Sequence, residues 1–167
     1  MLTRPETSRD VDAIRTVVAA AFLDAPHASH AEQFIVDALR AAGQLTVSLV
    51  ADEAGAVIGH VAVSPVTISD GATGWFGLGP VAALPAWQHR GIGVQLVRGA
   101  LAELRAHGSS GCVVLGNPQY YSRFGFRPQR SLVLPGVPPE YFQVLSFNGT
   151  LPTGTVAYHD AFSVQAR

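Results

Sequence analysis

The stretch GPVAALPAWQHRGIGVQLV, from Gly79 to Val97, constrains the fold most because it passes from a strand to a helix through a short turn. The apolar run from Pro80 to Leu84 is typical of a strand, and Pro85 ends it. Residues 91–107 carry apolar side chains on one side, which predicts an amphipathic helix that covers one face of a sheet.

The remaining periodicity predicts further helices and strands along the whole chain. Apolar residues recur every three or four positions in 11–22 and 32–42, which indicates two helices. Strands are expected at 45–51, 57–63, 74–83, 112–115, 141–147 and 155–158, with a short helical piece at 119–124. This order predicts an α+β (α/β) fold, a mixed sheet with helices on its faces, in a single domain over residues 1–167.

The composition excludes several classes of function. The sequence has 48% hydrophobic residues, a net charge of −1 and no lysine, so Schiff-base chemistry and the lysine of a phosphate-binding loop are excluded. The eleven arginines are spread along the chain, and we expect no nucleic-acid partner. No apolar run approaches the roughly 18 residues of a membrane span, and the N-terminus lacks a secretion signal, so a cytoplasmic protein is expected.

The cysteine and histidine residues give no sign of a disulfide or a metal site. Cys112 is the only cysteine and lies in the apolar run CVVL, where a buried, inert thiol is expected. The six histidines are scattered without the spacing of metal ligands, and we expect no metal.

The glycine pair at the start of the helix, Gly91 and Gly93, suggests an anion site. Glycines let the backbone approach a ligand, and the free N–H groups of a helix start attract negative charge. Arg90 adds a cation suited to phosphate. A tight turn without a ligand is the commoner explanation of two such glycines, and the dinucleotide pattern would need glycine where Leu96 stands.

The context favours a ligand. The pattern Gln88-x-x-Gly91-x-Gly93, between a strand and a long helix, resembles the coenzyme A signature of the GCN5-related N-acetyltransferase (GNAT) superfamily. The stretch GNPQYYSRFGF resembles the second helix motif of that superfamily, with Asn117 after the fifth strand and Tyr121 four residues before a Gly-Phe pair. The order of elements agrees over nearly the whole chain, from a strand-like start at residues 2–4 to the closing strands.

The resemblance implies a mostly antiparallel sheet whose fourth and fifth strands splay apart to admit the pantetheine arm of acetyl-CoA. Pro80 fits such a place because proline cannot donate to a strand ladder. Backbone amides near Val81 and Ala82 would hold the thioester, the turn would hold the pyrophosphate, and Asn117 would bond a pantetheine amide or simply form a turn. The implied cofactor-binding residues are Val81, Ala82, Gln88, His89, Arg90, Gly91, Ile92, Gly93 and Asn117.

The resemblance also implies direct transfer of the acetyl group to a small-molecule or peptide amine, with Tyr121 as the general acid. Adjacent residues on a helix point about 100° apart, so Tyr120 is expected to face away from the gap. A core tyrosine is the other explanation of Tyr121. The alternative function is an acyl-CoA-binding regulatory module without catalysis, which would have no use for Tyr121.

The general base is the part of the mechanism that the motifs leave open. Many relatives use a glutamate on the fourth strand, but residues 75–83 contain no acid. His60 and Glu32 remain as candidates, His60 ahead of Glu32, and a water relay without a protein base ranks above both. A core histidine and a first-turn helix acid are the ordinary explanations of these two residues.

Overall fold

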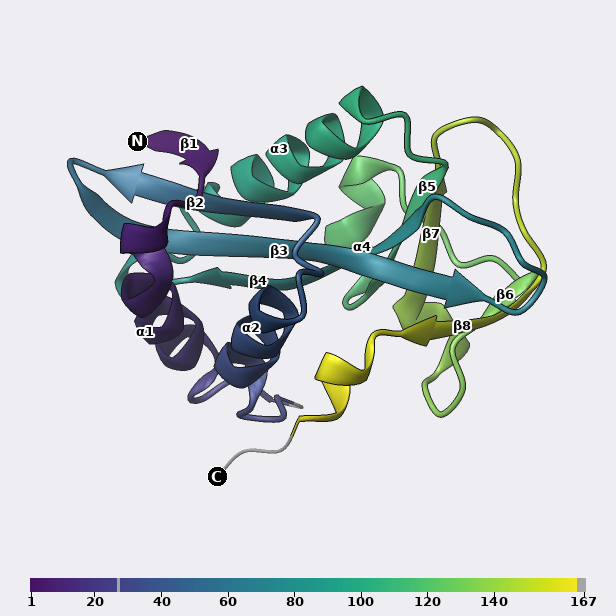
Figure 1. Ribbon diagram of the computed structural model, residues 1–167, viewed down its shortest axis with the longest axis horizontal. Helices are drawn as coiled ribbons and strands as arrows, with labels where there is room; N and C mark the ends of the chain where they lie inside the picture. The colour runs from purple at the N-terminus through teal and green to yellow at the C-terminus, as the bar shows by residue number, and fades with distance from the viewer. Residues whose placement is uncertain (27, 165–167) are drawn as a thin grey trace.

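The computed structural model describes residues 1–26 and 28–164, which form a twisted, mostly antiparallel sheet with helices on both faces (Figure 1). The main sheet has the order β1-β2-β3-β4-β5-β7, and only the β4–β5 pair in it is parallel. Its strands are β1 (Leu2–Pro5), β2 (Val47–Glu53), β3 (Ala56–Ile68), β4 (Trp75–Ala83), β5 (Gly111–Leu115) and β7 (Phe142–Ser146). The predicted fold class is confirmed.

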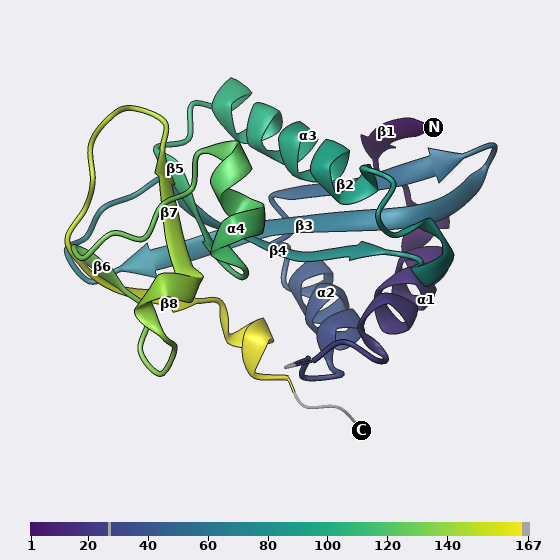
Figure 2. The same cartoon turned by 180° about the vertical axis from the view of Figure 1, so that it is seen from behind.

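The helices divide the core into layers. Helices α1 (Val11–Phe22) and α2 (Glu32–Ala41) cover one face, while α3 (Ile92–Ala106) and the short α4 (Pro118–Tyr121) cover the other (Figure 2). The apolar stripe of α3 is fully buried against β2 and β3; its members include Leu96, Val97, Ala100 and Leu104. Because each face of the sheet is covered, the strands between the helices are held rigidly.

The fourth and fifth strands, which the resemblance predicts to splay apart, do separate. β4 pairs with β5 only from Trp75 to Leu78, yet it continues along β3 to Ala83. The register with β3 shifts in this region, since Val61 pairs with Val81 but Val63 pairs with Leu78. One extra residue in β4 therefore forms a bulge at Gly79-Pro80, and bulges bend a strand away from its neighbour. The predicted splay is thus confirmed.

The sequence prediction was wrong in two details. β3 runs to Ile68, beyond the expected end at residue 63, because its last residues exchange partners and pair with β8 (Gly154–Tyr158). The strand β6 (Leu132–Val133), which pairs with β8, was missed because two residues show no alternation. The first helix is preceded by a 3-10 turn, Ser8–Asp10, which Thr7 and Asp10 cap.

Candidate functional site

A cleft of about 590 Å³ lies where β4 leaves β5. It is bounded by the end of β4, the turn before α3 with the first turn of that helix, and α4 with the 3-10 turn after it. Its lining residues are Val81, Ala82, Ala83, Trp87, Gln88, His89, Gly91, Ile92, Gly93, Val94, Tyr120, Tyr121 and Arg123. The structure therefore brings together seven of the nine implied cofactor-binding residues and Tyr121.

The turn before α3 presents its backbone to the cleft. His89 and Gly91 have left-handed backbone angles, with φ of +63° and +80°. The N–H of Gln95 donates to the carbonyl of Gly91, so the first N–H groups of α3, at Ile92 and Gly93, have no acceptor within the helix. No protein atom lies within 4 Å of where a Cβ of Gly91 would stand. The arrangement is an open, electropositive helix start.

Side chains of the turn hold its shape and add a charge. The Nε2 of Gln88 donates to the carbonyl of Ala83 at 3.1 Å, which ties the turn to the end of β4. The guanidinium of Arg90 lies 5.0 Å from the ring centroid of Trp87 and forms no ion pair within residues 1–26 and 28–164. Arg90 does not line the cleft itself, but its positive charge remains free beside it.

Both tyrosines of α4 face the cleft, so the expectation that Tyr120 would face away was wrong. Their ring centroids are 4.9 Å apart, the ring planes are at 86°, and both residues line the cleft. The hydroxyl of Tyr120 lies 2.8 Å from the Cβ position of Gly93, which explains why glycine stands there. α4 has only four residues and passes into a 3-10 turn, so helical spacing does not separate the two rings.

Tyr121 is the more buried of the two. Its ring packs on Gly116 and edge-on against Phe126. Burial raises the pKa of the Tyr121 hydroxyl well above its ordinary value, and it raises the pKa of Tyr120 as well. The Tyr121 hydroxyl therefore keeps its proton at neutral pH and can act as a proton donor.

Arg123 is a cleft residue that the sequence analysis missed. Its guanidinium stacks 4.6 Å from the Tyr120 ring centroid, and its Nε donates to the Tyr120 carbonyl at 2.9 Å. Its place three residues after Tyr120 on the same helical piece is the signal that could have found it. It supplies a second cation at the cleft.

Two of the predicted site residues have other partners. The Oδ1 of Asn117 accepts from the N–H of Gln119 at 2.9 Å and caps α4, and Asn117 does not line the cleft. The carboxylate of Glu32 accepts from the hydroxyl of Ser29 at 2.5 Å and from the N–H of Ala31 at 3.1 Å. Glu32 also lies outside the cleft lining. For both residues the structure gives a local role at a helix start.

His60 lies in a buried polar chain under α1 and α2. Its Nε2 is 2.8 Å from the hydroxyl of Ser48, which also contacts the carboxylate of Glu6, and Glu6 pairs with Arg40 at 3.0 Å. The Nδ1 of His60 is buried without a partner among the described residues. Burial lowers the pKa of His60 to about 4, against the opposing effect of Glu6, so the ring is neutral near pH 7.

The described residues contain no group of three or more His, Cys, Asp or Glu side chains placed to hold a metal ion. Within the same part of the chain, no helix has both the length and the apolar character that crossing a membrane requires.

Comparison with known proteins agrees with the geometry. A family model described as an acetyltransferase (GNAT) domain matches residues 44–128. The uncharacterized N-acetyltransferase YhbS of Escherichia coli K12 is 37% identical over 173 residues, which cover 98% of this chain and 99% of YhbS.

Two solved structures resemble the whole chain. A GNAT family acetyltransferase from Brucella melitensis in complex with acetyl-CoA is 49% identical, with a TM-score of 0.86, and covers 96% of this chain and 97% of its own. YhbS from Escherichia coli in complex with CoA is 35% identical, with a TM-score of 0.84, and covers 98% of this chain and 92% of its own.

The buried His60 predicts how stability depends on pH. In the unfolded protein, His60 takes up a proton as the pH falls below the ordinary histidine pKa of 6.5. In the folded protein, the pKa of His60 is about 4, so protonation occurs only near that pH. The unfolded state therefore binds more protons in this window, and the free energy of unfolding falls as pH drops from 6.5 toward 4. His60 contributes on the order of 3 kcal/mol to this fall.

Urea unfolding of wild type and His60→Gln at several pH values between 7 and 4 measures this contribution. We expect a shallower fall with decreasing pH in the variant, because glutamine does not titrate. Parallel curves for the two proteins would show that folded His60 titrates normally.

Proposed function

The chain belongs to the GNAT family of acetyltransferases, and from this premise we propose that its cleft binds acetyl-CoA and that the acetyl group passes directly to an amine. The observation that carries the proposal is the open start of α3, with its free N–H groups, facing the gap between β4 and β5. The bound coenzymes of the Brucella melitensis and Escherichia coli relatives support it. The family and its N-acetyltransferase members favour catalysis over a regulatory module that only binds acyl-CoA.

The turn before α3 binds the pyrophosphate in this proposal. The N–H groups at the start of α3, at Ile92 and Gly93, have no acceptor within the helix, and the helix dipole adds positive potential there. Gly91 leaves the space that a phosphate needs. Arg90, which lies over Trp87 in the turn, and Arg123, which lies over Tyr120, add positive charge near the cleft. Gln88 keeps the turn in place through its bond to Ala83.

The free edge of β4 holds the pantetheine arm and the thioester. Between Gly79 and Ala83 this edge has lost β5 as a partner, so its backbone groups are available to the coenzyme. The amide of Val81 would stabilise the oxyanion that forms when the amine attacks. The implied role of Ala82 does not fit in the same way, because the Leu84 N–H donates to Ile58 of β3 and strand alternation turns the Ala82 N–H toward β3 as well. The Oδ1 of Asn117 is occupied, so its Nδ2 is the atom left to donate to the pantetheine amide.

Tyr121 donates a proton to the departing sulfur. The amine nitrogen attacks the thioester carbon, the C–S bond breaks, and the thiolate takes the proton of the Tyr121 hydroxyl. The raised pKa of this hydroxyl keeps the proton in place until the thiolate forms. Tyr121 recovers its proton from solvent through the open cleft.

A water relay accepts the proton of the attacking amine. Glu32 is held by its own hydrogen bonds, and His60 is fully buried in its polar chain, so neither presents a free acceptor to the cleft. An amine with a pKa near 10 arrives mostly protonated, and only its neutral form attacks. Turnover should therefore rise with pH as the amine itself deprotonates.

Coenzyme binding tests the turn. Gly91→Glu should weaken acetyl-CoA binding about 100-fold or more, because it adds a negative charge in the phosphate space at a left-handed position. Arg90→Ala should weaken it by about 1–3 kcal/mol, the scale of one charged hydrogen bond. Titration calorimetry measures both.

Gly55→Glu is the matched control, since Gly55 also has a left-handed angle, with φ of +90°, and open space around it, but it lies in the β2–β3 turn. Wild-type affinity in Gly91→Glu, or an equal loss in Gly55→Glu, would rule out the turn as the phosphate site.

Turnover as a function of pH tests the acid and the base together. Tyr121→Phe should lower turnover about 100-fold while coenzyme affinity stays nearly unchanged, as expected for loss of a positioned proton donor. Tyr120→Phe is the control and should lower turnover less. His60→Gln and Glu32→Gln should keep the ascending limb of wild type, which follows the pKa of the amine supplied.

Two results would contradict these assignments. Full turnover in Tyr121→Phe would remove Tyr121 as the acid. Loss of the ascending limb in His60→Gln or Glu32→Gln would make that residue the base in place of the water relay.

A further inference from the structure

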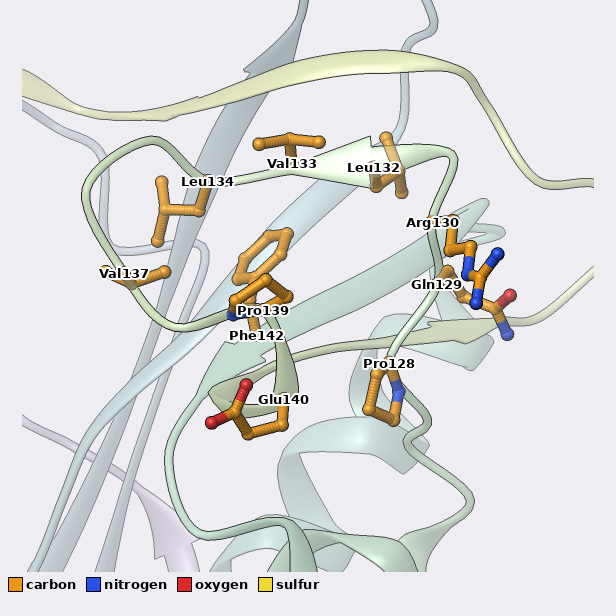
Figure 3. A pocket seen from close by; sticks show the side chains of 10 residues that line it. All are labelled: Pro128, Gln129, Arg130, Leu132, Val133, Leu134, Val137, Pro139, Glu140 and Phe142. Carbon is orange, nitrogen blue, oxygen red and sulfur yellow. The ribbon is translucent and has the colours of Figure 1, made fainter.

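A second cavity, of about 500 Å³, lies under the segment that joins α4 to β7 (Figure 3). None of its lining residues lines the coenzyme cleft. The cavity is open on one side and is lined by residues between 128 and 140, which fold over the ring of Phe142 on β7. The two cavities are therefore separate sites, lined by different elements of the same domain.

The chemistry of this cavity suits a neutral apolar group. The side chains around Phe142 are mostly aliphatic, among them Leu132, Leu134 and Val137. Arg130 and Glu140 are the charged residues of the lining, and they stand at opposite ends of it in Figure 3. Because their charges are opposite, the cavity offers no net charge to an anion or a cation.

Strand pairing connects this cavity to the mouth of the gap. The last pair between β4 and β5 is Leu78 with Val114, so Leu115 is the first residue of β5 beyond the separation. Leu115 pairs directly with Phe142, and paired residues place their side chains on the same face of a sheet. Leu115 is 46% exposed, which is unusual for a leucine in a central strand. Leu115 lines neither cavity, but this pairing places it directly beside Phe142 of the second cavity.

The cavity also lies on the side of the sheet that the coenzyme cleft leaves free. Tyr121 packs with the α3 face, where the coenzyme cleft opens. Phe142 packs with Leu132 and Val144 in a cluster on the opposite face. An amine that reaches the thioester through the gap from that opposite face passes Leu115 on its way.

We propose that this cavity, the residue 128–142 pocket, binds an apolar part of the acceptor, so that the acceptors are amines that carry an aliphatic or aromatic group. The proposal rests on the proposed acetyl transfer and names its substrate class. The amine would lie in the gap beside Leu115, and its apolar group would extend along Phe142 to Val137.

A series of n-alkylamines from ethylamine to octylamine tests the proposal, because chain length changes while amine basicity stays nearly constant. Each methylene that enters an apolar site contributes about 0.8 kcal/mol, or roughly 4-fold. We expect kcat/KM with acetyl-CoA to rise by about 4-fold per methylene over the part of the series that reaches the pocket.

Val137→Glu should flatten this rise, since it places a charge in the apolar lining. Leu151→Glu is the matched control, because Leu151 is 41% exposed and lies outside the pocket. Leu151→Glu should keep the alkylamine series of wild type, and both variants should keep its acetyl-CoA affinity. Val137→Trp, which fills the pocket without adding charge, should flatten the rise as well. It serves as a second variant in case Val137→Glu does not fold.

A binding measurement separates the two proposals. If acetyl-CoA binds but no amine is acetylated, the proposed function fails, and calorimetry of octylamine with wild type and Val137→Glu decides on the pocket alone. Weaker octylamine binding in Val137→Glu than in Leu151→Glu supports the pocket. Equal binding in the two variants, or a flat alkylamine series in an active wild-type enzyme, overturns it.

Discussion

The separation of β4 from β5 after Leu78 is the constraint on which the rest of the site depends. Strand pairing satisfies backbone N–H and C=O groups, and a buried group without a partner costs about 1–3 kcal/mol. β4 gives up one partner from Gly79 onward while β3 continues to hold its other edge. The bulge at Gly79-Pro80 makes this possible without breaking the sheet. What the sheet loses on that edge, a ligand with amide and carbonyl groups of its own can replace.

The elements around the gap follow from this separation. α3 follows β4 after a short turn, so its free N–H groups lie at the open end of the gap. α4 places Tyr121 beside the same gap. In the two proposals, opposite faces of the sheet have different tasks: one carries the turn that binds the coenzyme, and the other leads from Leu115 to the residue 128–142 pocket. The apolar residues of α1 and α2 pack on one face of the sheet, and those of α3 pack on the other.

Much of this arrangement could be predicted from the sequence because it depends on local patterns. The glycine pair, the proline at position 80 and the apolar stripes each specify a conformation within a few residues, and the α3 turn was placed correctly. The orientation of Tyr120 and the pocket could not be predicted in this way. The orientation of Tyr120 depends on a helix too short for regular spacing, and the pocket depends on how residues 128–140 fold over a distant strand. A core histidine was the ordinary explanation of His60. Its hydrogen-bonded contacts with Ser48 and Glu6 could not be predicted, because they join segments far apart in the sequence.

A crystal structure of the protein with acetyl-CoA tests the central claim most directly. We expect the pyrophosphate within hydrogen-bonding distance of the N–H groups of Ile92 and Gly93, and the pantetheine arm along β4 between Gly79 and Ala83. We also expect the thioester sulfur to lie within reach of the Tyr121 hydroxyl. A coenzyme bound elsewhere, or a gap between β4 and β5 that stays empty while the coenzyme is bound, would contradict the account.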